Sequence, residues 1–129
     1  MQRNKYLDDL GIPINKYGTN FTKGDFHKRK RWTKQRKLYG FDDRETWNLD
    51  YTFIEWLYSR LMMYKEVSIV DLNFNKYEFE GKEISQGEAI DYILNICKEV
   101  LKNDKYIKHN ENLNKAIKLF ADILPDMWW

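Results

Sequence analysis

The sequence is poor in the residues that build disulfides, transition-metal sites and proton-transfer pairs. It has one cysteine, Cys97, and two histidines, His27 and His109, in 129 residues. A single cysteine excludes an internal disulfide and offers no zinc cluster. Neither histidine lies in a motif that would activate a serine or cysteine nucleophile. We therefore expect no cofactor, no metal and no enzymatic activity.

Long apolar runs and glycine-rich phosphate loops are also missing. No stretch approaches the roughly 18 apolar residues that span a bilayer, and the first six residues contain no apolar signal core. No glycine-rich phosphate-binding loop follows a predicted strand. A chain of this length normally forms one domain. We expect a cytoplasmic protein with no membrane partner.

Charge is distributed unevenly although the net charge is only +2. Residues 1–40 hold eleven basic and three acidic residues, whereas residues 41–129 hold eleven basic and seventeen acidic residues. The segments therefore carry net charges of +8 and −6, with the boundary at Gly40. We predict a basic, partly irregular N-terminal arm over residues 1–40 and a helical core domain over residues 41–129. The arm either neutralises the core or serves an anionic partner.

The densest basic run covers residues 28–37, where seven of ten residues are lysine or arginine. A helix from about Asp25 to Tyr39 would place Trp32, Arg36 and Tyr39 on one face. Basic residues around an aromatic ring suit phosphate contacts and stacking on a base. In an alternative interpretation, the segment is solvated, packs through Trp32 and Leu38, and neutralises the acidic core. The candidate binding residues are Lys28, Arg29, Lys30, Arg31, Trp32, Lys34, Arg36 and Lys37.

A long central helix is predicted after Gly40. Asp42 has the capping-box spacing to Glu45, so the helix begins at Asp42, or a short first turn is followed by a second start at Asn48. We expect Trp47 and Trp56 to be the largest buried anchors. The apolar stripe at helical spacing consists of Phe53, Leu57, Leu61 and Tyr64.

Acidic residues cluster at the start of this helix, and in principle they suit Mg²⁺. The positive end of the helix dipole explains the same residues without a metal, since it favours nearby carboxylates. We therefore predict no metal site there. The four acidic residues are Asp42, Asp43, Glu45 and Asp50.

The segment after the central helix changes to a strand-like alternation. Residues 77–84 resemble a small hairpin that turns at Gly81. A lone hairpin is marginal in water, so this one is expected to pack on helices. The predicted fold class is mainly α, a three-helix core with a small β-hairpin between the first and second main helices.

Two more helices follow the hairpin. Ser85 and Glu88 have capping-box spacing and predict a helix that ends near residues 103–104. On it, Cys97 is interpreted as a small buried hydrophobe, and a reactive thiol is the alternative. The last helix is predicted from Asn110 or Asn112 to Leu124, before Pro125. Its expected apolar face consists of Leu113, Ile117, Phe120 and Leu124.

The chain ends in two tryptophans, Trp128 and Trp129. Large aromatic side chains are costly to leave in water. We expect them to close the core against the central helix, and a partner surface is the alternative.

Two separated blocks carry a resemblance to a known group of proteins. The first is Gly-Phe-Asp-Asp-Arg-Glu-Thr-Trp-Asn-Leu-Asp at residues 40–50, and the second is Leu-Phe-Ala at residues 119–121 followed by Trp128 and Trp129. They resemble a family of small proteins from tailed-phage and prophage genomes, to which no activity is assigned. The resemblance covers residues 40–129 and leaves out the basic arm. The resemblance implies a phage or prophage context, so the expected location is the cytoplasm of an infected or lysogenic bacterial host.

The expected function is that of a phage or prophage accessory protein which acts by stoichiometric binding. An inhibitor of a host nucleic-acid-guided defence nuclease, an anti-CRISPR role, is one form of this hypothesis. The expected partner is a host protein or ribonucleoprotein complex. The alternative is direct binding of DNA or RNA by the basic arm, and the third hypothesis is a structural or assembly component of the virion.

Overall fold

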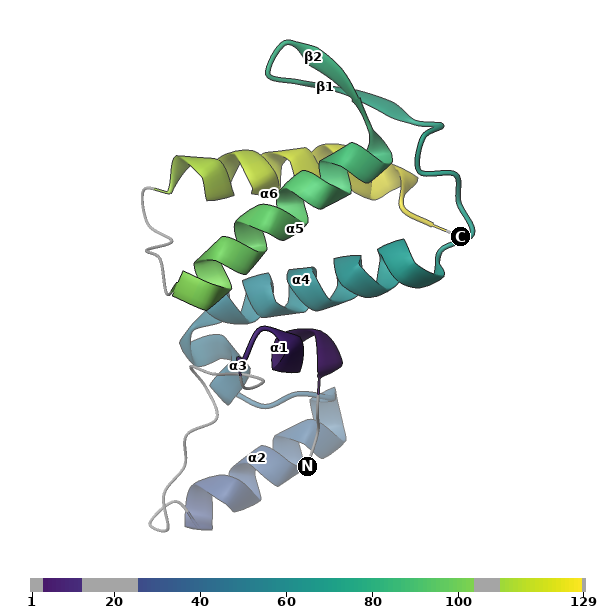
Figure 1. The fold of residues 1–129 in the computed structure, drawn as a ribbon. Helices are drawn as coiled ribbons and strands as arrows, with labels where there is room; N and C mark the ends of the chain where they lie inside the picture. Colours follow the sequence, from purple (N-terminus) through teal and green to yellow (C-terminus); the bar gives the residue numbers. More distant parts are fainter. Residues whose placement is uncertain (1–3, 13–25, 104–109, 129) are drawn as a thin grey trace. The chain divides into compact units, whose positions relative to one another are not determined.

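The computed structural model describes residues 4–12, 26–103 and 110–128, and for residues 26–28 it describes the backbone only. The described chain is mainly helical, with a two-stranded antiparallel hairpin between helices α4 and α5 (Figure 1). This confirms the predicted fold class. Within these ranges no helix combines the length and the apolar character needed to cross a membrane. Both histidines, His27 and His109, lie outside the side chains that are described.

The chain divides into two compact units, Met1–Trp56 and Leu57–Trp129. The first unit contains α1 (Lys5–Asp9), α2 (Phe26–Tyr39), α3 (Arg44–Trp47) and the first part of α4 (Leu49–Val67). The rest of α4 belongs to the second unit, which also contains β1 (Lys76–Phe79), β2 (Lys82–Ser85), α5 (Gln86–Asn103), α6 (Glu111–Ile123) and the short 3-10 helix η2 (Leu124–Asp126).

The N-terminal segment begins with a short helix rather than with irregular chain. Asn4 caps α1, because its side-chain oxygen accepts a hydrogen bond from the backbone N–H of Leu7 at 3.2 Å. Leu7 and Ile12 are buried, with 1% and 5% of their surfaces exposed. Leu7 and Ile12, which belong to the predicted arm, therefore pack into the protein interior. Residues 13–25 of that arm lie outside the described residues.

The central helix is preceded by a short helical turn and has a second start, which is the alternative that the sequence left open. The short helix α3 ends at Trp47, and α4 begins directly after Asn48. Asp43 directly precedes α3 but makes no side-chain cap bond, whereas the Asp42 carboxylate accepts the N–H of Arg44 in the first turn at 3.0 Å, as predicted for a capping residue. Asp42 is also buried against arginine side chains, with 3% of its surface exposed. Its carboxylate therefore pairs with charges from two separate segments.

The exposure of the tryptophans differs from the prediction. Trp47 and Trp56, expected to be buried anchors, are 49% and 44% exposed, and Phe53 of the expected stripe is 37% exposed. Trp32, from the segment predicted to reach out, is 1% exposed. Trp128 is 75% exposed and does not close a core, while Trp129 lies outside the described residues. The buried residues of α4 are Ile54, Glu55, Leu57, Tyr58, Ser59 and Leu61.

The hairpin of the second unit forms at the predicted place. Tyr77 pairs with Ile84, and the two turn residues Glu80 and Gly81 have φ angles of 51° and 77°. Positive φ at both positions is typical of a type I′ turn, whose twist suits a two-residue hairpin. The Tyr77 hydroxyl donates to the Asp126 carboxylate at 2.7 Å. As predicted for so small a hairpin, it is anchored to the helical part of its unit.

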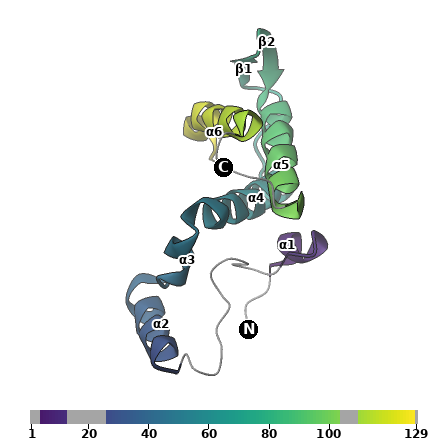
Figure 2. The same ribbon diagram turned by 90° about the vertical axis from the view of Figure 1, so that its left-hand side faces the viewer.

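Helices α5 and α6 lie side by side, and the hairpin extends from the N-terminal end of α5 (Figure 1 and Figure 2). The predicted capping box is confirmed. The Glu88 N–H donates to the Ser85 hydroxyl at 3.1 Å, and the Ser85 N–H donates to the Glu88 carboxylate at 3.2 Å. Asn110 caps α6 by accepting from the Leu113 N–H at 3.0 Å. Local sequence signals thus set both helix starts.

The buried face of α6 is rotated about the helix axis relative to the predicted face. Leu113 is buried as expected, but Leu124 is 52% exposed and lies beyond the α-helix in η2. The helix carries two overlapping apolar rows, and spacing alone does not tell which row faces α5. The buried residues of α6 are Leu113, Ala116, Leu119 and Ile123.

Cys97 lies inside the second unit with none of its surface exposed. Burial raises the pKa of its thiol to about 12. The interpretation as a buried hydrophobe is confirmed. We expect a chromogenic disulfide reagent at about pH 8 to leave Cys97 unmodified in the folded protein, because the reactive species is the thiolate. Denaturant should release one thiol equivalent per chain, and rapid labelling without denaturant would contradict this expectation.

Candidate nucleic-acid interface

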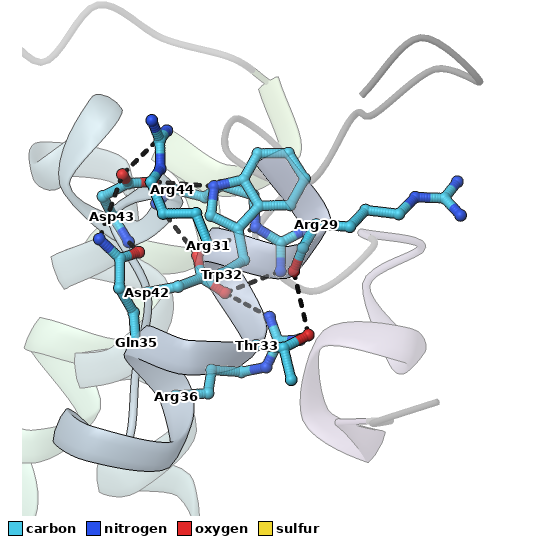
Figure 3. Close-up of polar contacts among 9 residues, drawn as sticks. All are labelled: Arg29, Arg31, Trp32, Thr33, Gln35, Arg36, Asp42, Asp43 and Arg44. Carbon is cyan, nitrogen blue, oxygen red and sulfur yellow. Dashed lines mark hydrogen bonds and ion pairs between the residues drawn. The ribbon is translucent and has the colours of Figure 1, made fainter. Parts of the chain in front are cut away.

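Helix α2 contains the basic run, and a glycine turn ends it. The helix spans Phe26–Tyr39, close to the predicted boundaries. Gly40 has a φ of 84°, and its N–H donates to the Arg36 carbonyl at 2.9 Å. A left-handed residue directly after a helix reverses the chain, and glycine takes that conformation without a steric penalty. The turn brings Asp42 and Asp43 back against α2 (Figure 3).

Asp42 is held by two arginines. Its two carboxylate oxygens accept from Nε and Nη2 of Arg44 at 2.9 and 2.8 Å, a bidentate pair, and Arg36 donates to the second oxygen. The backbone N–H of Arg44 adds a bond of 3.0 Å. Burial alone would raise the pKa of Asp42, but the hydrogen bonds from Arg44 and Arg36 and the charge of Arg44 outweigh it and hold the pKa below its ordinary value.

Asp43 holds the neighbouring turn of the same helix. Its carboxylate accepts from Trp32 Nε1 at 2.9 Å and from Gln35 Nε2 at 3.3 Å, and it pairs with Arg31 at 3.0 Å. In return, the Asp43 N–H donates to the Gln35 side-chain oxygen at 2.9 Å. We call Asp42, Asp43 and the α2 side chains bound to them the aspartate clamp; those side chains are Arg31, Trp32, Gln35 and Arg36.

Trp32 is the apolar centre of this clamp. The Arg44 guanidinium carbon lies 4.3 Å from the centre of the Trp32 ring, in a cation–π geometry, and the Trp47 ring meets Trp32 edge-on at 6.0 Å. With 1% of its surface exposed, Trp32 has no free face on which a base can stack. The alternative interpretation of the basic run expected Trp32 and Leu38 to pack against the protein. It is correct for Trp32 and wrong for Leu38, which is 64% exposed.

Three lysines lie on the side of α2 away from the clamp. Lys30, Lys34 and Lys37 are spaced by four and three residues, so they form one row along the helix. At about 100° per residue, this row is centred roughly opposite Trp32. All three side chains are exposed, and within the described part of the chain none of them forms an ion pair. We call these three residues the lysine row.

The other predicted site residues are placed differently. Arg31 and Arg36 belong to the clamp, although half of each side chain remains in contact with solvent. Arg29 is exposed, and its backbone carbonyl accepts from the Thr33 hydroxyl at 3.0 Å (Figure 3). The side chain of Lys28 lies outside the described ones. Of the eight predicted residues, the structure thus places three in the clamp and three in the lysine row.

The acidic residues near Asp42 do not form a metal centre in the described ranges. No group of three possible metal ligands occurs there. The oxygens of Asp42 and Asp43 accept hydrogen bonds from arginine, tryptophan and glutamine side chains, which leaves them engaged within the protein. Arginine pairing and helix-start chemistry therefore account for this cluster.

Sequence reasoning missed an apolar groove in the first unit. The groove has a volume of about 330 Å³, and its polar lining consists of Glu45 and two threonines. The signal was present, because large apolar residues recur from Phe41 to Trp56, but the spacing of Phe53 and Trp56 predicted that both would be buried in the core. The lining residues are Phe41, Glu45, Thr46, Leu49, Thr52, Phe53 and Trp56.

Comparisons with protein-family models, with curated proteins and with solved structures found no match to this chain. The interface is therefore interpreted from its own chemistry.

Proposed function

We propose that this protein acts by binding rather than by catalysis, and that the lysine row of α2 contacts the phosphates of a nucleic acid. One observation carries the proposal. Lys30, Lys34 and Lys37 are exposed on one helix face without a carboxylate partner among the described residues, while Arg31 and Arg36 on the opposite side are held by Asp42 and Asp43. Cations in this arrangement release counterions when they meet phosphates, which supplies binding free energy.

The aspartate clamp supports this proposal by holding the helix in place. Like charges four residues apart destabilise an isolated helix by a few tenths of a kcal/mol per pair. Helix α2 has no acidic residue in its first turn to offset its charge. The bonds from Asp42 and Asp43 compensate by attaching α2 to the chain that follows it. The lysine row is therefore presented on a fixed helix, and an anionic partner would relieve its repulsion.

The biological setting of the proposal follows from the resemblance to phage and prophage proteins. A small phage accessory protein that binds phosphates suits a host complex that itself contains DNA or RNA. A nucleic-acid-guided defence nuclease belongs to this class, and the protein would act on it as a stoichiometric, anti-CRISPR-like inhibitor. Direct binding of free nucleic acid is the alternative, and a virion component is the third candidate.

Replacing the lysine row by glutamines, in the variant K30Q/K34Q/K37Q, is expected to weaken nucleic-acid binding and its salt dependence. Three lost phosphate contacts reduce the slope of log K against log salt by about 2–3. Between about 50 and 200 mM salt, the wild type should therefore lose affinity about 20- to 40-fold more than the variant. Fluorescence anisotropy with labelled random DNA and RNA at several salt concentrations measures this difference.

The matched control removes three exposed lysines from the second unit, in the variant K98Q/K102Q/K118Q. It has the same net charge as the lysine-row variant, and all three positions are exposed. Equal losses in both variants would show that overall charge, rather than the row, causes binding, and would overturn the proposal. A pull-down from host lysate, with and without nuclease treatment, separates a host complex from free nucleic acid.

A further inference from the structure

We infer that the apolar groove of the first unit accepts unpaired bases of a single-stranded nucleic acid whose backbone contacts the lysine row. This inference rests on the proposed function, because it names the kind of nucleic acid bound and adds a second part to its site. It concerns residues that the lysine row does not include.

The groove has the chemistry of a stacking surface. Three of its lining residues are aromatic and partly exposed: Phe41 at 49%, Phe53 at 37% and Trp56 at 44%. The rings of Phe53 and Trp56 are nearly parallel, with an angle of 15° and centroids 6.1 Å apart. A contiguous exposed apolar patch marks an interaction site. Aromatic faces accept any base, because every base has a flat π surface.

The groove and the lysine row are joined by a short segment of chain. Lys37 precedes Phe41 by four residues, so their Cα atoms are at most about 14 Å apart. Between them, Tyr39 is 66% exposed, and its ring lies 6.4 Å from that of Phe41. An exposed aromatic surface therefore continues from the end of α2 into the groove. By helical spacing Tyr39 lies on the Trp32 side of α2, so a strand of a few nucleotides reaches both parts by passing round the C-terminal end of the helix.

The positive charge of the lysine row and the aromatic lining of the groove together favour a single strand over the other possible occupants. A single strand combines a phosphate backbone, which complements the lysine row, with flat bases, which complement the aromatic groove. A duplex keeps its bases stacked inside and offers only phosphates. An apolar peptide matches the groove but leaves the row unpaired.

The first test uses the wild-type protein and three labelled probes of equal length: a single strand, a duplex of the same sequence, and an abasic strand. The abasic strand has the phosphates but no bases. We expect the single strand to bind about 5- to 150-fold more tightly than the abasic strand for each stacked base. Equal affinity for the single and abasic strands would overturn the inference while leaving the lysine row, and with it the proposed function, intact.

The second test replaces the stacked pair in the variant F53A/W56A, with Trp128→Ala as the matched control. Trp128 is 75% exposed and lies in the second unit. We expect the groove variant to lose the preference for the single strand over the abasic strand, and the control to keep it. If the groove variant keeps that preference, the inference fails. This holds even if the variant no longer captures a protein partner in a pull-down. If no probe binds the wild type at low salt, the proposed function fails as well.

Discussion

Replacement of Trp32 by alanine is expected to destabilise the first unit by about 3–5 kcal/mol, the cost of removing a fully buried aromatic side chain. Trp32 is 1% exposed and is the apolar centre of the aspartate clamp. Its loss leaves a cavity and removes a ring contact with Trp47, the cation–π contact with Arg44 and the hydrogen bond to Asp43. The described contacts of helix α2 that would remain are the polar bonds of Arg31, Gln35 and Arg36 to Asp42 and Asp43.

Trypsin provides a local measurement of this effect. Helix α2 contains many lysine and arginine residues, so its release exposes several cleavage sites at once. We expect Trp32→Ala to be cut within residues 29–37 at protease concentrations that leave the wild type intact, with fragments identified by mass spectrometry. Trp32→Phe keeps an aromatic ring but loses the N–H donor and part of the buried indole volume, so it should cost more than about 1 kcal/mol, the value of the hydrogen bond alone, and less than Trp32→Ala.

Trp128→Ala is the control for a tryptophan that is exposed rather than buried. It should change neither the thermal unfolding midpoint nor the trypsin pattern. If Trp32→Ala also left both unchanged, Trp32 would not be the packing centre of the clamp. The assignment of the basic run to a clamped side and an outward side would then be wrong.

The second large effect is expected from Asp42→Asn. The substitution keeps the shape of the side chain but removes the charge that faces Arg36 and Arg44. The Arg44 side chain is only 11% exposed, so it would keep a positive charge with little access to water. Removing one partner of a buried ion pair costs about 3–5 kcal/mol. Denaturant unfolding followed by circular dichroism measures the loss.

Asp50→Asn is the matched control, because Asp50 is an exposed aspartate near the start of α4. Its removal should change stability by less than about 0.5 kcal/mol, as for most surface substitutions. Comparable losses in the two variants would show that the negative charge near the helix start matters in general. The specific role assigned to Asp42 in holding α2 would then be incorrect.

The stabilisation from Asp42 should also depend on pH. Burial opposes ionisation of Asp42, but the hydrogen bonds from Arg44 and Arg36 prevail, and its pKa in the folded protein lies below the ordinary value. A carboxyl group with a lowered folded pKa stabilises the protein fully above its unfolded pKa of about 3.9, and this contribution is lost as the pH falls through the folded pKa. The stability difference between the wild type and Asp42→Asn should therefore be constant near neutral pH and shrink below about pH 4. A difference that grew on acidification would contradict this assignment.

Local sequence signals predicted the secondary structure well, because each depends on residues only a few positions apart. Ser85 and Glu88 satisfy each other across one helical turn, and Asn110 caps the helix that begins next to it. Gly81 takes the left-handed conformation that a tight hairpin requires. The predicted helix over the basic run, and its end at Gly40, rest on the same kind of short-range rule.

Burial of the aromatic residues was predicted poorly. Trp47 and Trp56 have the composition and spacing of core residues, yet both are largely exposed, whereas Trp32 is enclosed. Hydrophobicity states how much free energy burial would release, but it does not state which side chain another segment will cover. The apolar groove lined by Phe53 and Trp56 was overlooked for this reason.

By itself, the sequence determined the fold class, the helix and hairpin boundaries, and the basic run at residues 28–37 as a candidate interface. Only the tertiary structure divided that run. Arg31 and Arg36 bind aspartates across the Gly40 turn, and the lysine row is left facing outward. The physical reason is that a cation's partner depends on which carboxylate the folded chain brings within hydrogen-bond distance, and composition and spacing do not specify that distance.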